Sequence, residues 1–245
     1  MKILGIIPAR YESSRFPGKP LADIAGKSMI QRVYEQSSKV PAFTKVLVAT
    51  DHKEIYEHVL AFGGNAVITS PAHPTGTDRC YEALHKEDKY YEFVVNIQGD
   101  EPFVAPKQIE LLVSVLNPAV ELATLVKKID REEELNDPNE VKVVINKNME
   151  GIYFSRSPIP YQKDTPRSEW VHKHKCYKHV GIYAYRSDVL DSITKLPVSA
   201  LEKAESLEQL RWIENGYAIK VAITDVDSMC IDSPEDIEKA IRLFT

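Results

Sequence analysis

The chain has 245 residues, of which 43% are hydrophobic, enough to bury one large core or two small ones. Its formal net charge of −5 argues against a nucleic-acid binder that works by neutralising backbone phosphates. No apolar run approaches the roughly 20 residues of a membrane span, so we expect no membrane insertion.

The three cysteines, Cys80, Cys176 and Cys230, stand far apart in the chain. Their spacing fits neither a disulfide framework nor a metal motif. The opening residues also lack the pattern of a signal peptide. Together these features predict a cytoplasmic protein.

The first apolar run, residues 4–7, predicts a buried first strand of an α/β sheet. The loop that follows carries three cations, Arg10, Arg15 and Lys19. Ligands of open α/β sheets bind beyond the carboxyl ends of strands, and guanidinium and ammonium groups suit phosphate oxygens. A solvated basic loop is the alternative, but the position directly after the first strand favours a triphosphate site.

Strands and helices then alternate along the first half of the chain, which predicts parallel βαβ units. Ser28 is the expected N-cap of the first helix, and two glycines at 63 and 64 are expected to end the second. The expected elements are a helix over 29–39, a strand over 45–50, a helix up to residue 62, a strand over 65–69, a helix over 78–86 and a strand over 92–97.

Two polar segments follow these strands. Thr-Gly-Thr-Asp-Arg at 75–79 reads as a glycine turn and a helix cap, and backbone amides at a helix start favour an anionic ligand. Gln-Gly-Asp-Glu-Pro at 98–102 ends the strongest buried strand. A carboxylate there, on Asp100, is well placed to hold a hard cation. The alternatives are a solvated Arg79 and an Asp100 that only caps the turn before Pro102.

The second half of the chain predicts strands that add to the parallel sheet, two of them as an antiparallel hairpin. The expected elements are a helix over 106–116, a strand over 120–129, a short acidic helix or turn over 131–135, hairpin strands over 139–144 and 151–156, a strand over 179–186, a helix over 206–212, a strand over 217–226 and a last helix that begins at Ser233-Pro234.

The stretch over 161–178 is polar and carries His172, His174 and Cys176 at every second position. Alternation would place these three side chains on one strand edge. A zinc site there is disfavoured, because the sequence offers no fourth ligand nearby.

Several of these segments resemble the 3-deoxy-D-manno-octulosonate (KDO) cytidylyltransferases, or CMP-KDO synthetases. The resemblance covers nearly the whole chain, and its most specific motifs are Pro-Ala-Arg-Tyr-Glu-Ser-Ser-Arg-Phe-Pro-Gly-Lys at 8–19, Thr-Gly-Thr-Asp-Arg at 75–79, Gln-Gly-Asp-Glu-Pro at 98–102, His-x-Gly-Ile-Tyr at 179–183, Leu-Glu-Gln-Leu-Arg at 207–211 and Ile-Asp-Ser-Pro-Glu-Asp at 231–236. Cys230 departs from the small residue that the family usually has there, and we expect little chemical consequence.

The resemblance implies an α/β fold: a three-layer sandwich with a mostly parallel, Rossmann-like nucleotidyltransferase sheet and an antiparallel addition. It implies a single domain over 1–245, in which residues 139–186 form a substrate-binding and dimerisation subregion of a homodimer. It also implies transfer of CMP from CTP to the anomeric 2-hydroxyl of KDO, which gives CMP-KDO and pyrophosphate for lipopolysaccharide synthesis.

The resemblance further assigns site residues, with Mg²⁺ as cofactor. It implies nucleotide contacts from Pro8, Ala9, Arg10, Arg15, Lys19, Thr75, Gly76 and Asp100. It implies sugar-acid contacts from Arg79, Gln98, His179, Tyr183, Glu208 and Gln209. Metal would bind Asp100 and Asp232, and Arg10, Lys19 and Asp100 would act in catalysis without a side-chain general base.

Plain structural roles remain as alternatives for four of these residues. His179 could simply start a strand, Glu208 and Gln209 could lie on a solvated helix face, and Asp232 could precede a helix whose positive end favours it.

Two other functions compete with this assignment. One is a related nucleotidylyltransferase that activates sialic acid or a simple sugar; sialic-acid activators usually have a glycine-rich first loop, which this chain lacks. The other is a nucleotide-binding sensor without turnover, disfavoured because a sensor needs no pair of carboxylates for metal. The sequence does not separate KDO from its 8-amino analogue.

Overall fold

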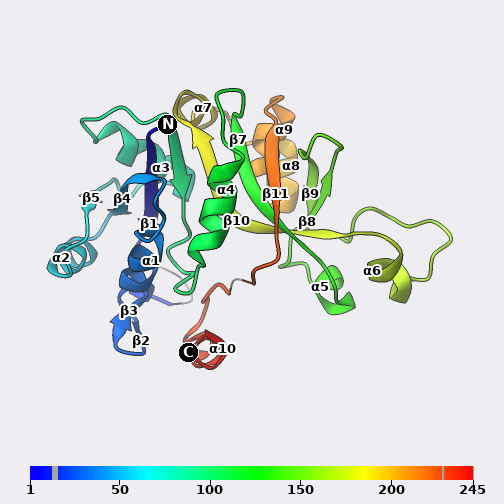
Figure 1. Cartoon of the computed structure of the whole chain (residues 1–245), viewed down its shortest axis with the longest axis horizontal. Coiled ribbons are helices and arrows are strands. Elements are labelled where there is room, and N and C mark those ends of the chain that lie inside the picture. Colours follow the sequence, from blue (N-terminus) through cyan, green and yellow to red (C-terminus); the bar gives the residue numbers. More distant parts are fainter. Residues whose placement is uncertain (13–15, 228, 245) are drawn as a thin grey trace. The chain divides into compact units, whose positions relative to one another are not determined.

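The computed structural model describes residues 1–12, 16–227 and 229–244. The chain forms two compact units, the first made of Met1–Glu110 with Asp227–Thr245 and the second of Leu111–Val226 (Figure 1). None of the helices in the described ranges has both the length and the apolar character that crossing a membrane requires.

The first unit is built on four parallel strands in the order β6-β1-β4-β5. Their bounds are β1 (Ile3–Ala9), β4 (Phe43–Thr50), β5 (Ala66–Ile68) and β6 (Phe93–Asn96). Six of the seven residues of β1 are buried, and so are all four of β6. These near-continuous apolar strands confirm the predicted parallel sheet, which is covered on its faces.

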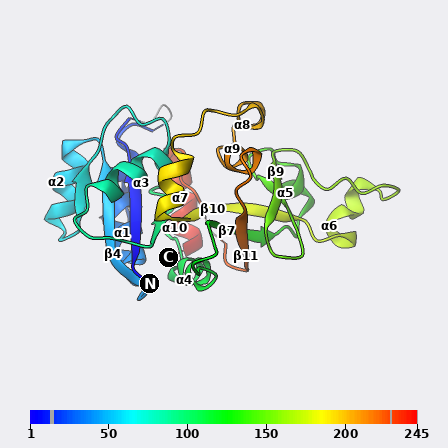
Figure 2. The ribbon, with the colours of Figure 1, turned by 90° about the horizontal axis from the view of Figure 1, so that it is seen from above.

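The helices α1 (Met29–Ser37), α2 (Lys53–Ala61) and α3 (Gly76–His85) pack against these strands (Figure 2). The unit also contains α10 (Pro234–Phe244), whose Ala240 is buried with Ile24 and Met29, while α4 (Pro106–Ser114) begins in this unit and ends in the second. Ser28 caps α1 as predicted, because its Oγ accepts from the Gln31 amide at 3.2 Å. Gly63, with φ of 84°, follows the end of α2 in the left-handed conformation expected there.

A small hairpin of β2 (Asp23–Ile24) and β3 (Lys27–Ser28) was not predicted. Its turn places Ala25 at φ 50° and Gly26 at φ 81°, the two consecutive positive values of a tight hairpin turn. Strands of two residues carry no readable periodicity, so the sequence gives no signal for this element.

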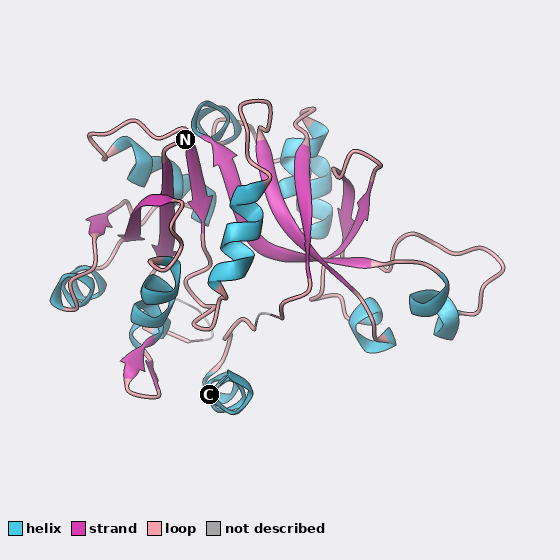
Figure 3. Cartoon of the chain, viewed as in Figure 1, coloured by secondary structure: helices cyan, strands magenta, loops and turns pink. Residues whose placement is uncertain are grey.

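The second unit confirms the predicted antiparallel addition (Figure 3). In it, β7 (Leu122–Lys128) pairs in parallel with β11 (Ile219–Thr224) and antiparallel with β10 (Tyr177–Arg186). The hairpin of β8 (Lys142–Ile145) and β9 (Gly151–Ser155) is antiparallel as predicted, and β8 extends β10. Among the described residues, all of these strands belong to one nine-stranded sheet, and with the flanking helices it establishes the α/β fold class.

The helices of the second unit are short. They are α5 (Glu132–Asn136), α6 (Trp170–Lys173), α7 (Ser187–Ile193), α8 (Ala200–Glu205) and α9 (Gln209–Glu214). The helix predicted over 206–212 is wrong at its start, because Ser206 takes φ 52° and ends α8. The capping box of Ser199 and Glu202 was the missed sequence signal for α8.

The strand edge predicted for His172, His174 and Cys176 is also wrong. His172 lies in α6, and His174 follows this helix as an exposed residue. Cys176 is buried in a cluster with Ile129, Leu135, Trp170 and Val171. Burial of the Trp170 side chain gives this stretch a helical turn instead of an alternating strand.

Candidate active site

A pocket of about 340 Å³ opens in the first unit at the carboxyl ends of β1 and β6. Four predicted segments meet there: the end of β1, the start of α3, the loop after β6 and the segment before α10. The residues that line it are Pro8, Ala9, Arg10, Lys19, Pro20, His73, Pro74, Thr75, Gly76, Arg79, Gln98, Gly99, Asp100 and Asp232. The structure therefore brings together most of the residues that the sequence assigned to the nucleotide and the metal.

Glycine is required where the loop after β6 meets β1. A Cβ atom added to Gly99 would lie 2.7 Å from the Pro8 carbonyl oxygen, closer than real Cβ contacts. Gly99 thus lets the backbone before Asp100 lie against the end of β1.

Lys19 joins the two predicted metal ligands. Its Nζ donates to Asp100 Oδ2 at 2.7 Å and to the Ile231 carbonyl at 2.8 Å, and it lies 3.8 Å from Asp232 Oδ1. A cation of the protein thus already lies between both carboxylates. Carboxylate and carbonyl oxygens form the donor set of a hard divalent ion, so these residues fit a metal of the Mg²⁺ type.

The segment that carries Asp232 is anchored on both sides. The Ile231 amide donates to the Asp100 carbonyl at 2.9 Å, and its side chain is buried with Ile24 and Met29. The Asp236 carboxylate accepts from the amides of Asp232 and Ser233 at 3.1 and 3.0 Å. Burial raises the pKa of Asp236, but these hydrogen bonds outweigh it and the net shift is downward.

Cys230 adds a donor that the sequence did not indicate. Its Sγ and one carboxylate oxygen each of Asp100 and Asp232 lie within 4.8 Å of one another. The residue is exposed, yet desolvation at the sulfur, followed by the Asp100 and Glu101 charges, strongly raises the pKa of the thiol. The sequence predicted little chemical consequence of a cysteine at position 230. It could not show that the sulfur lies near the two carboxylates, because the fold brings them together.

Of the loop cations, Arg10 is exposed and lines the pocket, while Arg15 lies outside the described residues. The loop is held at its start by Tyr11, whose ring stacks on His52 with centroids 3.9 Å apart. The Tyr11 amide also donates to Asp51 Oδ1 at 3.3 Å. Asp51 and His52 directly follow the strand predicted over 45–50, and the sequence indicated no role for them in the site.

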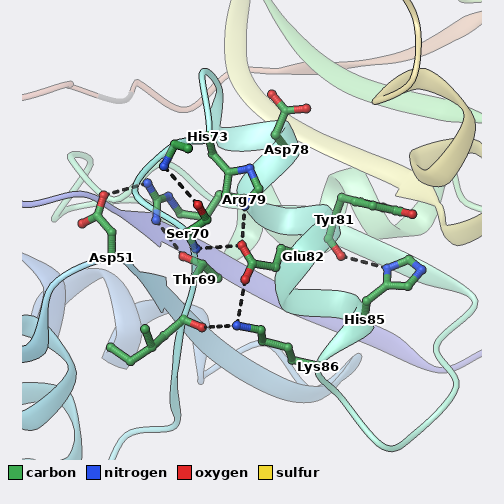
Figure 4. Close-up of polar contacts among 12 residues, drawn as sticks. Asp51, Thr69, Ser70, His73, Asp78, Arg79, Tyr81, Glu82, His85 and Lys86 are labelled. Carbon is green, nitrogen blue, oxygen red and sulfur yellow. Dashed lines mark hydrogen bonds and ion pairs between the residues drawn. The ribbon is translucent and has the colours of Figure 1, made fainter.

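Arg79 is buried, and the contacts of its guanidinium are internal (Figure 4). It donates to Asp51 Oδ2 at 2.9 Å and to Thr69 Oγ1 at 2.6 Å. Asp51 therefore connects Arg79 on one oxygen with the Tyr11 amide on the other. This arrangement favours a role in holding the loop and leaves the predicted sugar-acid contact of Arg79 without direct support.

Arg79→Ala is expected to lower the free energy of unfolding by about 3 kcal/mol, because it leaves the Asp51 carboxylate partly buried without its partner. Urea denaturation of the whole chain measures this. The matched control is Arg242→Ala, which removes an exposed pair with Glu238 and should cost less than about 0.5 kcal/mol. Equal, small effects in both variants would contradict the structural role of Arg79.

His73 is a pocket residue that the sequence did not single out. Its Nε2 contacts the Glu82 carboxylate, which also accepts from the Ser70 amide at 2.8 Å and pairs with Lys86 at 2.7 Å (Figure 4). Burial raises the pKa of Glu82, but its hydrogen bonds to Lys86, Ser70 and His73 bring it to about 2. A single histidine in a loop gives no sequence signal for such a pair.

In the second unit, β10 carries His179 and Tyr183 side by side, with ring centroids 5.1 Å apart. His179 Nε2 lies 2.9 Å from Thr124 Oγ1, and burial lowers the pKa of His179 to about 4. The imidazole is therefore neutral at neutral pH. The Tyr183 hydroxyl is buried and makes no hydrogen bond to any residue within the described ranges.

Glu208 and Gln209 lie at the start of α9. Glu208 is half-buried and its charge acts on Tyr183, whose pKa is raised well above the ordinary value by burial first and by Tyr185 and Glu208 next. Gln209 is only 6% exposed, so the alternative of a solvated helix face does not hold for it.

The chain is similar in sequence to known cytidylyltransferases over nearly its whole length. Residues 4–223 match the family described as cytidylyltransferase. A 3-deoxy-manno-octulosonate cytidylyltransferase from Cytophaga hutchinsonii is 55% identical over 238 residues, which cover 97% of this chain and 95% of the relative. One from Parabacteroides distasonis is 57% identical over 249 residues, with coverage of 100% and 98%.

Solved structures agree. The structure of CMP:2-keto-3-deoxy-manno-octonic acid synthetase complexed with CTP superposes with a TM-score of 0.93 at 44% identity, and covers 99% of this chain and 98% of its own. A putative glucose-1-phosphate thymidylyltransferase from Bacillus anthracis, at 18% identity and a TM-score of 0.65, shares the fold over 98% of this chain and 94% of its own. The chain belongs to the cytidylyltransferase family, within the group of 3-deoxy-manno-octulosonate cytidylyltransferases.

Proposed function

We propose that the chain transfers CMP from CTP to the anomeric 2-hydroxyl of KDO and releases pyrophosphate, with Mg²⁺ as cofactor. The observation that carries the proposal is the meeting of Lys19, Asp100 and Asp232 in the pocket at the ends of β1 and β6. The names of the relatives and the CTP complexed with the solved neighbour support it.

The proposal assigns the nucleotide to the pocket of the first unit. A triphosphate carries several negative charges, which must be neutralised before an oxygen nucleophile can approach the α-phosphorus. Arg10 and Lys19 supply positive charge in this pocket, and the amides at the start of α3, next to Thr75 and Gly76, favour anionic or carbonyl groups. Pro8 and Ala9 form the wall beside them.

Asp100 and Asp232 would hold the metal, since their oxygens already surround the Lys19 ammonium. When bound, Mg²⁺ would neutralise phosphate charge and lower the pKa of the sugar hydroxyl. Lys19 would then be available to the phosphate oxygens, because its place between the carboxylates is taken.

The proposal assigns the sugar acid to Gln98 and to His179, Tyr183, Glu208 and Gln209. A neutral His179 suits a sugar hydroxyl better than the carboxylate, since it cannot form an ion pair. The buried Tyr183 hydroxyl, with no hydrogen bond to a described residue, can gain one from a polyhydroxylated ligand.

Tyr183→Phe is expected to raise the KM for KDO by about 3- to 10-fold, because one hydrogen bond to the sugar is lost. Its free energy of unfolding should stay within about 1 kcal/mol of that of the parent chain. Steady-state kinetics and urea denaturation measure the two effects. Tyr161→Phe, which changes a hydroxyl on a side chain that is 79% exposed, is the control. An unchanged KM would remove Tyr183 from the sugar site.

A homodimer formed through residues 139–186 is part of the proposal. Ile152 and Tyr161, both in this segment, are 52% and 79% exposed, and large apolar side chains of this kind gain from being covered. Sedimentation velocity would show the dimer, and Ile152→Asp should weaken it. The three free cysteines agree with a cytoplasmic location.

Pyrophosphate release with Mg²⁺ and CTP, compared among KDO, N-acetylneuraminate and no acceptor, tests the function. Release with KDO alone is the expected result. Release with N-acetylneuraminate alone would show that the acceptor is this sialic acid and not KDO. CTP binding without any pyrophosphate release would favour the nucleotide-binding sensor.

A further inference from the structure

We propose that Asp100, Cys230 and Asp232 form a second kind of metal site, one that binds a thiophilic divalent ion such as Zn²⁺ or Cd²⁺ through the Cys230 thiolate. The three donor atoms lie within 4.8 Å of one another. Two are hard carboxylate oxygens and the third is a soft sulfur, a set that suits Zn²⁺ and Cd²⁺ better than Mg²⁺.

A cation already lies between the two carboxylates of this site. The Lys19 ammonium is 2.7 Å from Asp100 Oδ2 and 3.8 Å from Asp232 Oδ1, with the Ile231 carbonyl at 2.8 Å. These oxygens hold a positive charge without any metal. A divalent ion gains more from the same oxygens, and it reaches them through the pocket that Lys19, Asp100 and Asp232 line.

The backbone holds Cys230 and Asp232 in place on either side of Ile231. The Ile231 side chain is fully buried, and its amide donates to the Asp100 carbonyl at 2.9 Å. Asp236 binds the Asp232 amide at 3.1 Å. The thiol and both carboxylates are therefore positioned by anchored backbone, and only their side chains need to move.

The movement required is small. Zinc–sulfur and zinc–oxygen bonds of about 2.3 and 2.0–2.2 Å place tetrahedral donors roughly 3.5 Å apart, against the 4.8 Å within which the donors lie here. Binding forms a metal–sulfur bond and breaks the thiol S–H bond, whose proton leaves to solvent, and no electrons are exchanged. The Lys19 ammonium moves away, and the fourth position stays open to water.

This site shares its carboxylates with the metal of the proposed reaction. If that function holds, a thiophilic ion excludes Mg²⁺ and stops CMP transfer until a chelator removes it. The metal site itself does not depend on the proposed function, because its three ligands are defined without substrates.

The test is a Cd²⁺ titration of the full chain without substrates, followed by the ultraviolet charge-transfer absorbance of the cadmium–thiolate bond and by calorimetry. We expect the absorbance to saturate at one Cd²⁺ per chain. Cys230→Ser should abolish it and weaken Cd²⁺ binding by at least about tenfold, and Asp232→Asn should weaken binding on the same scale.

The control is Cys176→Ala, which removes a thiol that is only 1% exposed and should leave the absorbance unchanged. The proposal would be overturned if the charge-transfer absorbance survived in Cys230→Ser. It would also be overturned if the parent chain bound Cd²⁺ without showing this absorbance. Because the readout needs no turnover, either failure leaves CMP transfer intact, while absence of pyrophosphate release would leave the metal site intact.

Discussion

Asp100→Asn is expected to lower kcat by at least about 100-fold, the cost of removing one strong electrostatic contribution to a transition state. Asp100 lies in the loop after β6, accepts a hydrogen bond from Lys19 at 2.7 Å and lies near Asp232. The amide keeps the shape of the carboxylate and removes its charge, so metal and Lys19 both lose their shared partner. Pyrophosphate release at saturating CTP and KDO measures the effect.

Asp88→Asn is the matched control, because Asp88 is an exposed carboxylate of the same unit and does not line the pocket. It should leave kcat unchanged. An Asp100→Asn variant that folds normally, as judged by its urea midpoint, and still turns over near the parent rate would rule out metal binding by this carboxylate.

Lys19→Met is expected to raise the KM for CTP by about tenfold and to lower kcat by about 100-fold, because charge-assisted contacts to phosphate are lost from the ground state and the transition state. Lys19 is only 14% exposed in its side chain and is surrounded by two carboxylates, so its loss also removes the cation that balances them. Initial rates over a range of CTP concentrations separate the two constants.

Lys27→Met is the control, because it removes one lysine charge from the same unit without changing the pocket. Lys27 is exposed, belongs to the same unit and pairs with Glu35 at 2.6 Å. Its replacement should leave both constants unchanged. If Lys19→Met behaved like Lys27→Met, Lys19 would be only a structural counter-ion of Asp100.

The sequence predicts the first unit well where apolar periodicity is strong. The buried residues of β1, β4 and β6 form short continuous apolar runs, and caps such as Ser28 mark where helices begin. The pocket follows from the same information, because the carboxyl ends of parallel strands meet at one edge of a sheet.

The sequence fails where structure depends on contacts between distant segments. The α6 helix forms because Trp170 and Val171 bury against Ile129 and Leu135, which lie far away in the chain. His172, His174 and Cys176 stand at every second position in the sequence, which is the spacing expected of one edge of a strand. The backbone does not form a strand there, because His172 lies in α6.

The candidate site shows the same limit. Motif spacing indicates that Arg79 belongs near the pocket, but only the fold shows its guanidinium engaged with Asp51 and Thr69. Likewise, nothing in the sequence around Cys230 brings its sulfur near Asp100, which precedes it by most of the chain. Contacts between residues that are distant in the chain can be found only from the tertiary structure. The helix, strand or loop that carries each motif can be predicted from the sequence.

The most direct measurement of the central claim is ³¹P NMR of a reaction that contains the chain, CTP, KDO and Mg²⁺, recorded early in the time course. We predict a new phosphodiester resonance from CMP-KDO that grows in equal amount with pyrophosphate. Pyrophosphate that appears with free CMP from the first time point, and without any phosphodiester resonance, would show hydrolysis of CTP instead of transfer and would contradict the account.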